Sequence, residues 1–454
     1  MTIPPPPPGR FDDDAPLDDP DNDNAEVSNV IKFNGWRQGL LCNDKGKIKN
    51  LEHNVYQILR FHPDWSGCIA YDEFASNILL RKSPPYDPAS ERGPYPRKWI
   101  DQDTTATMAW LQGTRRALVD ASRSVTDGSV MLVAHRQSFH PVRDYLGTLK
   151  WDGEQRLPRF LTRYLGAPDT PYAAQVGTAW LISAIARVMR PGCQADYMLV
   201  LEGNQGKRKS TALRELFSDE WFSDARLTMN DEGLKKLRGK WGMEIPELEG
   251  FRGKAASEIK AFITSRIDHY RESYGRHPKD FPRTCVFAGT TNEREYLIDR
   301  TGNRRFWPVL CGDIALEALR DDRDQIWAEA LTRFQCKENW WLEDEADARE
   351  EQRKREVREP WFELITAWLV DPTVPDGTHG ARRRINLEQG FTIAEAMQGA
   401  LNLRAADMQR EAQTRVGFCL HKLGFEAHRV QRDGSRERRY FKRGTFMVRS
   451  PAQQ

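Results

Sequence analysis

The stretch LEGNQGKRKST, residues 201–211, combines glycines, cations and hydroxyls in an order that could hold nucleotide phosphates. Phosphate-binding loops follow the pattern G-x-x-x-x-G-K-[ST], whose backbone N–H groups cradle the phosphates. Gly203 opens the pattern and Lys209 and Ser210 close it, but Arg208 stands where the second glycine belongs. Because a helix should begin here, we expect Arg208 to adopt near-helical backbone angles and to be tolerated.

Each polar residue of this loop has an expected task. Lys209 would reach the β- and γ-phosphates, and Ser210 would place its hydroxyl on magnesium. Gly203 and Gly206 allow the positive φ of a tight wrap. The alternative is a basic surface turn with two glycines. The candidate nucleotide-binding residues are Gly203, Asn204, Gln205, Gly206, Lys207, Arg208, Lys209, Ser210 and Thr211.

Polar residues that could serve ATP hydrolysis follow two later apolar runs. Glu244 and Glu247 come at the end of WGMEIPELEG. An NTPase needs carboxylates to hold magnesium and to polarise the attacking water, and either glutamate could do either. Asn292 ends the run CVFAGTTN, where its amide could orient the hydrolytic water. Taken singly, these side chains could equally be solvated strand ends.

Two arginines precede an apolar anchor in TGNRRFWPV. Arg304 or Arg305 could stabilise the charge of a transferring phosphate, in the same subunit or on a neighbour. Paired surface arginines that only form ion pairs are the alternative.

The segment IKAFITSRIDHYRESYGRHPKDFPR, residues 259–283, mixes cations with aromatic residues. Such a mixture suits phosphate contacts and base stacking along single-stranded DNA. Asp268 and Glu272 weaken the charge argument, so a solvated connection is an equal alternative. The candidate DNA residues here are Arg266, Tyr270, Arg271, Tyr274, Arg276 and Lys279.

A second basic cluster lies near the C-terminus, in RVQRDGSRERRYFKR. Cations on such a segment would bind DNA phosphates with an affinity that falls steeply with salt. A basic tail that only aids solubility is the alternative. The candidate residues are Arg429, Arg432, Arg436, Arg438 and Arg439.

The elements that must position these residues alternate between strand and helix. DYMLVLEG reads as a buried strand that enters the loop, TALRELF as a helix that leaves it, and WGMEIPEL and TCVFAGTTN as further strands. AAQVGTAWLISAIARVMRPG reads as a strongly apolar helix closed by Pro191 and Gly192. Alternation of this kind predicts an α/β core with a largely parallel sheet.

Composition divides the 454 residues into four parts. Residues 1–28 are proline-rich and acidic, and we expect disorder. Residues 29–140 read as mostly helical, with helical spacing in LEHNVYQILRFHP and DEFASNILL. Residues 141–350 hold the candidate ATPase, and the charged run 338–359 suits a solvated connector. Residues 351–454 read as three helices and a β-hairpin, which is winged-helix order.

The overall charge and cysteine pattern set further expectations. The formal net charge is only +2, but the acidic N-terminal and basic C-terminal ends point to nucleic acid at the C-terminal end. The seven cysteines show no CxxC spacing and no accompanying histidine cluster, so we expect reduced thiols. No long apolar run or signal region is present, and we expect a cytoplasmic protein without membrane contact.

From about Pro141 to Trp341 the chain resembles the virulence-associated protein E family of bacteriophages and mobile elements. The resemblance rests on six stretches in order, EGNQGKRKST, WFSD, WGMEIPELEG, IKAFITSRIDHYRESYGR, FAGTTNEREYL and TGNRRFWPV. It implies an AAA+-like P-loop NTPase, related to superfamily 3 and poxvirus-type primase-helicases, that hydrolyses ATP with Mg²⁺. Many members carry glycine at the position of Arg208. By position, the resemblance makes Lys209 and Ser210 the phosphate and metal residues, Glu244 and Glu247 the acidic strand end, Asn292 the sensor, and Arg304 or Arg305 the arginine finger.

The expected function is therefore an ATP-dependent DNA helicase or replication initiator that acts as a homo-oligomeric, hexameric ring. In related ring helicases the insertion equivalent to residues 266–279 lines the pore. The alternative is a DNA-binding initiator or a host-interaction or anti-phage protein that binds nucleotide as a switch with little turnover.

Overall fold

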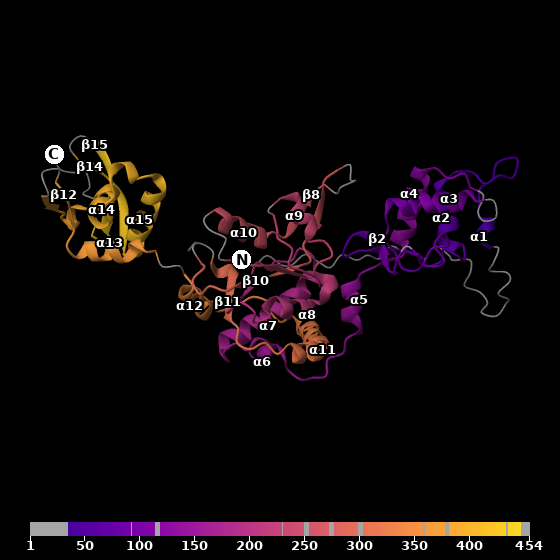
Figure 1. Ribbon diagram of the computed structural model, residues 1–454, viewed down its shortest axis with the longest axis horizontal. Coiled ribbons are helices and arrows are strands. Elements are labelled where there is room, and N and C mark those ends of the chain that lie inside the picture. Colours follow the sequence, from indigo (N-terminus) through magenta and orange to yellow (C-terminus); the bar gives the residue numbers. More distant parts are fainter. Residues whose placement is uncertain are drawn as a thin grey trace, which may run out of the picture.

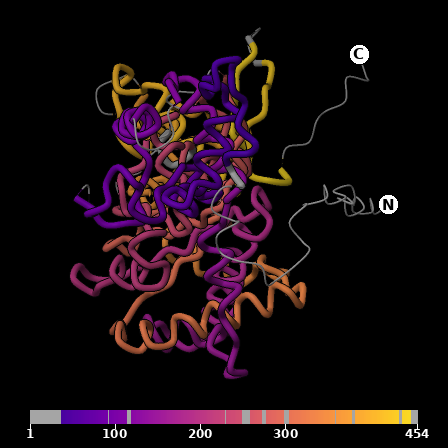
Figure 2. Tube along the Cα trace, turned by 90° about the vertical axis from the view of Figure 1, so that its right-hand side faces the viewer, coloured from indigo at the N-terminus to yellow at the C-terminus, as the bar shows by residue number. Residues whose placement is uncertain are grey.

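The chain forms three units in a row, with the N-terminal and C-terminal units at opposite ends of the middle one (Figure 1). Viewed along that row the units overlap, and α11 lies toward one side of the middle unit (Figure 2). The predicted disordered tail, residues 1–28, lies outside the residues that the structure describes. The computed structural model describes residues 35–91, 93–113, 119–228, 230–248, 254–271, 277–297, 303–356, 359–376, 381–432 and 435–445.

The N-terminal unit combines the expected helices with a sheet that the sequence did not predict. Its described strands pair in the order β3-β2-β1-β4. The helical expectation for DEFASNILL is wrong, because the Asp72 carboxylate accepts hydrogen bonds from the N–H groups of Phe74 (2.8 Å) and Ala75 (3.0 Å) and closes a turn between two strands. The elements are α1 (Gly35–Gln38), α2 (Glu52–Phe61), β1 (Ile69–Asp72), β2 (Asn77–Leu80), β3 (Arg97–Lys98), α3 (Asp101–Gln112), α4 (Arg123–Arg136) and β4 (Ser138–Phe139).

The middle unit is built on a parallel sheet, as expected, with the described strands in the order β11-β5-β10-β7-β6. Its strands are β5 (Met198–Glu202), β6 (Phe222–Ser223), β7 (Gly242–Ile245), β10 (Val286–Thr291) and β11 (Phe306–Leu310). Its helices are α5 (Pro141–Thr148), α6 (Phe160–Leu165), α7 (Pro171–Met189), α8 (Lys209–Trp221), α9 (Asp231–Lys236), α10 (Lys254–Thr264) and α11 (Leu316–Gln335).

Both faces of this sheet are covered, which explains why its strands read as unbroken apolar runs. Leu199 and Leu201 of β5 face the core that contains α7, α8 and α11. Met198 and Val200 alternate with them and face the core that contains α10. The strand that leads into the candidate loop is therefore fixed from two sides.

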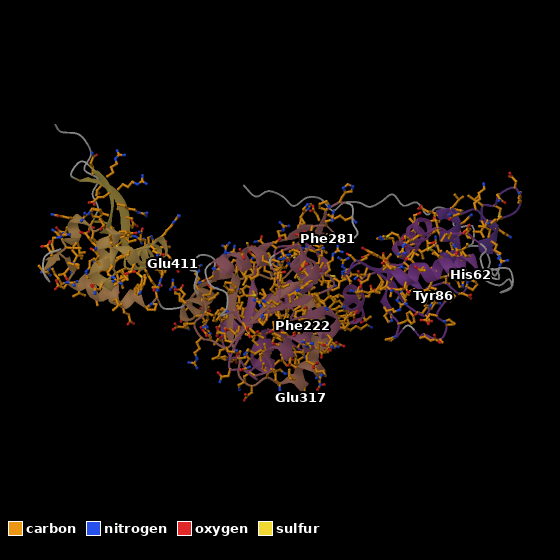
Figure 3. All side chains as sticks on the ribbon, turned by 45° about the horizontal axis from the view of Figure 1, so that its top comes forward. His62, Tyr86, Phe222, Phe281, Glu317 and Glu411 are labelled. Carbon is orange, nitrogen blue, oxygen red and sulfur yellow. The ribbon has the colours of Figure 1, made fainter. Side chains whose placement is uncertain are left out.

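A hairpin of β8 (Ile267–Tyr270) and β9 (Lys279–Pro282) is inserted between α10 and β10. It projects from the middle unit, and Phe281 lies on the other side of that unit from Glu317 at the start of α11 (Figure 3). Within the described residues, no helix has the length and apolar character needed to cross a membrane.

The C-terminal unit contains the expected helices and basic hairpin, joined to the sheet by α12 (Ala346–Lys354). Phe391, just before α14, forms a β-bridge with Tyr440 of β15, so the hairpin packs onto the helices. A short pair of strands, β12 and β13, adds to the expected order. The elements are α13 (Trp361–Val370), β12 (Thr373–Pro375), β13 (Arg382–Arg384), α14 (Ile393–Leu401), α15 (Arg410–Lys422), β14 (Phe425–Arg432) and β15 (Ser435–Lys442).

Candidate functional site

The loop of residues 203–208 connects β5 to α8, and its backbone makes the turn that the glycine spacing suggests. Gly203 has φ 144° and Gly206 has φ 84°. Arg208 has φ 62° and ψ 27°, which is left-handed, so the expectation of near-helical angles is wrong. Side chains other than glycine adopt this conformation at a cost of about 1–2 kcal/mol. Arg208 therefore replaces the second glycine of the pattern at a position whose left-handed backbone favours glycine.

Lys209 is the first residue of α8, and its side chain folds back into the loop. It is only 7% exposed. Its Nζ donates to the carbonyl oxygens of Gly203 (2.6 Å) and Asn204 (3.2 Å) and to Oδ1 of Asn292 (3.1 Å). Lys209 and Asn292, which are 83 positions apart in the sequence, therefore meet at the carboxyl edge of the sheet.

A buried carboxylate lies beside the hydroxyl of Ser210. Glu244 is 1% exposed, and its Oε1 accepts from Ser210 Oγ (2.6 Å) and from Thr290 Oγ1 (2.7 Å). Its Oε2 is buried and has no hydrogen-bond partner in the described part of the chain. An orphaned carboxylate oxygen is costly, and a cation or a donor would satisfy it.

These residues fit a magnesium ion that is completed by phosphate. Mg²⁺ takes one or two protein oxygens together with waters and substrate phosphates. Ser210 and Glu244 supply a hydroxyl and a carboxylate next to the loop. No group of three histidine, cysteine or acidic side chains that could hold a metal occurs among the described residues.

Glu247, the second acidic candidate, differs from Glu244 in its exposure. It is exposed and has φ 54°, another left-handed position. Of the two glutamates, buried Glu244 is the one that accepts a hydrogen bond from the Ser210 hydroxyl. Asn292 is exposed apart from its contact with Lys209.

Arg304 and Arg305 lie at the other end of the sheet from the loop. In the parallel pairing of β11 with β5, Phe306 is opposite Met198 and Leu310 is opposite Glu202. The arginines precede Phe306, whereas the loop follows Glu202, so the length of a strand, roughly 13 Å at 3.3 Å per residue, separates them. A role for them at this subunit's own loop does not fit this arrangement.

The arginine pair lines a cavity of about 600 Å³ between the 3₁₀ turn Asn303–Arg305 and α12. Arg304 is exposed and Arg305 is half-buried. Arg349 and Arg353 of α12 also line this cavity. The carboxylates of Glu345 and Glu356 line it as well, so arginines outnumber glutamates four to two in its lining.

The candidate DNA residues of the β8–β9 hairpin divide into exposed and buried groups. Arg271 and Lys279 are exposed near its tip, and exposed Arg266 donates to the carbonyl oxygen of Gly192 (2.7 Å). Tyr270 is 3% exposed, and its ring packs at a tilt against that of Phe281, with 4.6 Å between the ring centroids, so it is part of the hairpin's packing. Tyr274 and Arg276 lie outside the described residues.

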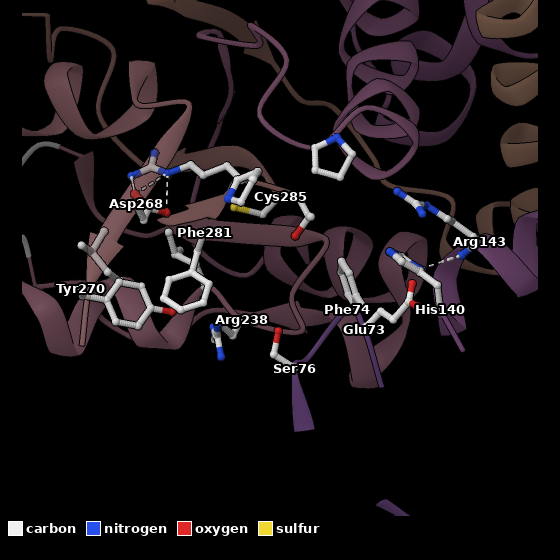
Figure 4. Close-up of a pocket in the computed structure, with 16 residues that line it drawn as sticks. Glu73, Phe74, Ser76, His140, Arg143, Arg238, Asp268, Tyr270, Phe281 and Cys285 are labelled. Atoms are coloured by element: carbon white, nitrogen blue, oxygen red, sulfur yellow. Dashed lines mark hydrogen bonds and ion pairs between the residues drawn. The ribbon is translucent and has the colours of Figure 1, made fainter. Parts of the chain in front are cut away.

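A cavity of about 310 Å³ lies at the base of this hairpin, where the N-terminal unit meets it (Figure 4). Phe74 from the β1–β2 turn and His140 line one side, and Tyr270 and Phe281 line the other. Burial, with the nearby charge of Arg143, lowers the pKa of His140 to about 4. Residues of the N-terminal unit and of the hairpin thus line the same cavity.

The basic C-terminal hairpin places like charges opposite each other. Arg429 pairs with Arg438 across the two strands, and both are exposed, as is Arg436. Opposed like charges destabilise a hairpin, so an anion would stabilise it. Arg439, also a candidate DNA residue, is buried and donates to the carbonyl oxygen of Gly390 (2.7 Å). The side chain of Arg432 lies outside the described set.

Sequence reasoning missed Glu202, the last residue of β5. It is 4% exposed, and its carboxylate accepts hydrogen bonds from Arg355 and Tyr296. An acidic residue at the end of an otherwise apolar run, directly before Gly203, was the available signal. Its partner Arg355 lies in a charged segment that was expected to be solvated.

Residues 146–359 match the family model of the virulence-associated protein E-like domain. The resemblance drawn from the six motifs is therefore confirmed for the segment that contains them. No curated protein matches the chain.

Two solved structures of the NrS-1 C terminal region are similar to this chain, each over 83% of this chain and 96% of that chain. The A form apo structure has 10% identity and a TM-score of 0.43, and a second apo structure has 11% identity and a TM-score of 0.42. Similarity at this level is too low to assign a fold or a function.

Proposed function

Since residues 146–359 form a virulence-associated protein E-like domain, we propose that the chain is an ATP-hydrolysing motor or initiator in the replication of bacteriophage or mobile-element DNA. The observation that carries this proposal is the convergence of Lys209, Ser210 and buried Glu244 at the loop after β5. The proposed architecture is an AAA+-like P-loop core with a winged-helix-like C-terminal module.

The nucleotide would be held by the loop backbone and by Lys209. On binding, the Lys209 ammonium would exchange the carbonyl oxygens of Gly203 and Asn204 for the β- and γ-phosphates, which carry more negative charge. Ser210 and Glu244 would hold Mg²⁺, which neutralises phosphate charge when bound. Asn292, already in contact with Lys209, would orient the attacking water, and Glu247 is the second acidic candidate.

The position of the arginines supports a shared active site. Arg304 and Arg305 are a strand's length from their own loop, so they would act on the nucleotide of a neighbouring subunit. Heterologous contacts form a ring when the rotation between neighbouring subunits closes. We propose such a closed homo-oligomer, a hexamer.

DNA would contact two separate surfaces. Arg266, Arg271 and Lys279 on the β8–β9 hairpin would meet single-stranded DNA, while Arg429, Arg436 and Arg438 would bind phosphates. ATP hydrolysis would then move the β8–β9 hairpin relative to DNA that the C-terminal hairpin holds.

A nucleotide switch with little turnover is the second candidate. The observation that favours it is the left-handed Arg208, which places a strained, bulky residue at the edge of the loop. ATP binding without phosphate release would support it.

The test is ATP hydrolysis with and without DNA for wild type, Lys209→Ala and the exposed-surface control Lys150→Ala. We expect Lys209→Ala to lose activity by about two orders of magnitude or more, as when a phosphate-stabilising donor is removed, while the control stays unchanged. Equal inactivity of wild type and Lys209→Ala across DNA substrates would contradict the motor proposal.

A further inference from the structure

The carboxylate of Glu202 is held in a buried ion pair directly before the candidate loop. Arg355 donates from Nε to Oε1 (2.9 Å) and from Nη2 to Oε2 (2.8 Å), and the Tyr296 hydroxyl donates to Oε1 (2.8 Å). Paired donors of this kind fix orientation as well as distance. Burial and the charge of Glu202 raise the pKa of Tyr296 well above its usual value, so its hydroxyl stays a donor.

The backbone of Glu202 fixes where the loop starts. Its carbonyl oxygen accepts from the N–H of Cys311, the residue that follows the neighbouring strand β11 (2.8 Å). Gly203 follows with φ 144°, and a Cβ there would lie 3.3 Å from the Cys311 carbonyl oxygen. Because Gly203 packs closely against the backbone of Cys311, a shift of Glu202 would move the loop.

Backbone hydrogen bonds hold Arg355, the residue that follows α12. Its carbonyl oxygen accepts from the N–H groups of Tyr296 (3.1 Å) and Leu297 (3.0 Å). One turn earlier, Gln352 donates to the carbonyl oxygen of Phe306 (2.9 Å), the residue after the arginine pair. The end of α12 therefore contacts both the start of the loop and the segment that bears Arg304 and Arg305.

The residues that follow Arg355 are tied to the C-terminal unit. Glu356 forms an ion pair with Lys422 (3.8 Å), and Glu359 forms one with Arg415 (2.6 Å). The Arg415 guanidinium also lies 3.7 Å from the ring centroid of Trp361. Both cations belong to α15, the helix that leads into the basic β14–β15 hairpin. Side-chain contacts thus connect α15 to the segment around Arg355, and Arg355 contacts Glu202 directly before the loop.

We propose that Arg355 is a positioning residue through which DNA bound at the C-terminal hairpin regulates the nucleotide site. The proposal rests on the proposed ATPase function. DNA docking would shift α15, the Glu356 and Glu359 contacts would carry the shift to Arg355, and Glu202 would carry it to the loop.

The test uses the full chain and measures ATP affinity, DNA affinity, and hydrolysis with and without DNA. Arg355→Lys keeps the positive charge but loses the paired geometry, and Arg415→Gln breaks the link on the far side of Arg355. The matched control Arg320→Gln breaks the surface ion pair between Arg320 of α11 and Glu215 of α8. Thermal unfolding with each variant reports whether it folds.

We expect Arg355→Lys to weaken ATP binding and to reduce the stimulation by DNA, each about five- to tenfold. Arg415→Gln should reduce the stimulation by a similar factor but leave basal hydrolysis and ATP affinity unchanged, a split that a purely structural role would not produce. Arg320→Gln should match wild type.

Two results would overturn the inference in different ways. If wild type is stimulated by DNA and Arg415→Gln is stimulated equally, the coupling is wrong while the proposed function stands. If wild type binds no ATP, the proposed function fails, and this inference fails with it.

Discussion

At the scale of single residues, Arg208 gives the clearest physical question, because its backbone is left-handed at the start of α8. We predict that Arg208→Gly raises the free energy of unfolding by about 1 kcal/mol, since glycine adopts this conformation without the Cβ penalty. ATP binding should tighten as well, because the side chain no longer crowds the loop. Denaturant unfolding and ATP titration measure the two effects.

Ser218 provides the matched control for Arg208, since it also has positive φ (65°) but lies near the other end of α8. Ser218→Gly should raise stability without changing ATP affinity. If Arg208→Gly leaves ATP affinity unchanged or weakens it, the arginine is neutral or takes part in binding.

Residue types and spacing predicted part of the candidate site but not all of it. The spacing identified Lys209, Ser210 and Glu244 as candidates, and these side chains do converge. The conformation of Arg208 could not be predicted, because the pattern only says that glycine is usual. The Glu202–Arg355 pair was out of reach because its partners are 153 positions apart and only the folded chain brings them together.

At the scale of elements, the N-cap residue of α5 is His140, whose protonation should affect stability. His140 Nδ1 accepts from the N–H of Arg143 (3.2 Å) at the helix start, and burial together with the Arg143 charge lowers the pKa of His140 to about 4. Below its unfolded pKa of roughly 6.5 the unfolded chain binds a proton that the folded chain does not. Stability is therefore lost as pH falls from about 6.5 to about 4, by at most about 3 kcal/mol.

The test is His140→Asn, which keeps an acceptor at the start of the helix and removes the titration. Denaturant unfolding of both proteins between pH 7.5 and pH 4 should show a steeper loss for wild type. Parallel curves would contradict the assignment.

The β14–β15 hairpin carries the second prediction at this scale. Replacing exposed Arg436 and Arg438 together by alanine should weaken DNA binding at all sequences and lower the slope of log affinity against log salt by about 2. Arg384→Ala in β13, whose side chain pairs with Asp371, is the control. Arg439→Ala should instead lower thermal stability, because Arg439 is buried against Gly390. An unchanged salt slope in the double variant would mean that DNA binds at another surface.

Elements were predicted well where one signal dominates. The strands β5, β7 and β10, the helix α7 and the C-terminal hairpin were expected from the sequence, whereas β6 and β11 were not predicted as strands. DEFASNILL was misread because its apolar spacing fits a helix, whereas the Asp72 turn decides the structure. The residues of α12 were read as solvated because they are charged, yet Gln352 and Arg355 pack against the sheet.

At the scale of the whole molecule, the sheet register separates Arg304 and Arg305 from the candidate loop of the same subunit. The loop follows the carboxyl end of β5 while Arg304 precedes the amino end of β11. If the proposed ring forms, each site combines the Lys209 of one subunit with the Arg304 of the next. Two variants that are each inactive should then complement each other, since they are damaged on different sides of the interface.

We predict that Lys209→Ala and Arg304→Ala are each inactive in ATP hydrolysis, and that mixing them restores part of the activity. In randomly mixed rings about a quarter of the interfaces combine an intact lysine with an intact arginine, which sets the upper limit of recovery. A Lys209→Ala/Arg304→Ala double variant mixed with either single variant contributes no additional intact interface and serves as the control. Recovery confined to the first mixture would require a shared site. Full activity of Arg304→Ala alone would leave Arg305 as the candidate, and no recovery with either arginine variant would contradict the ring.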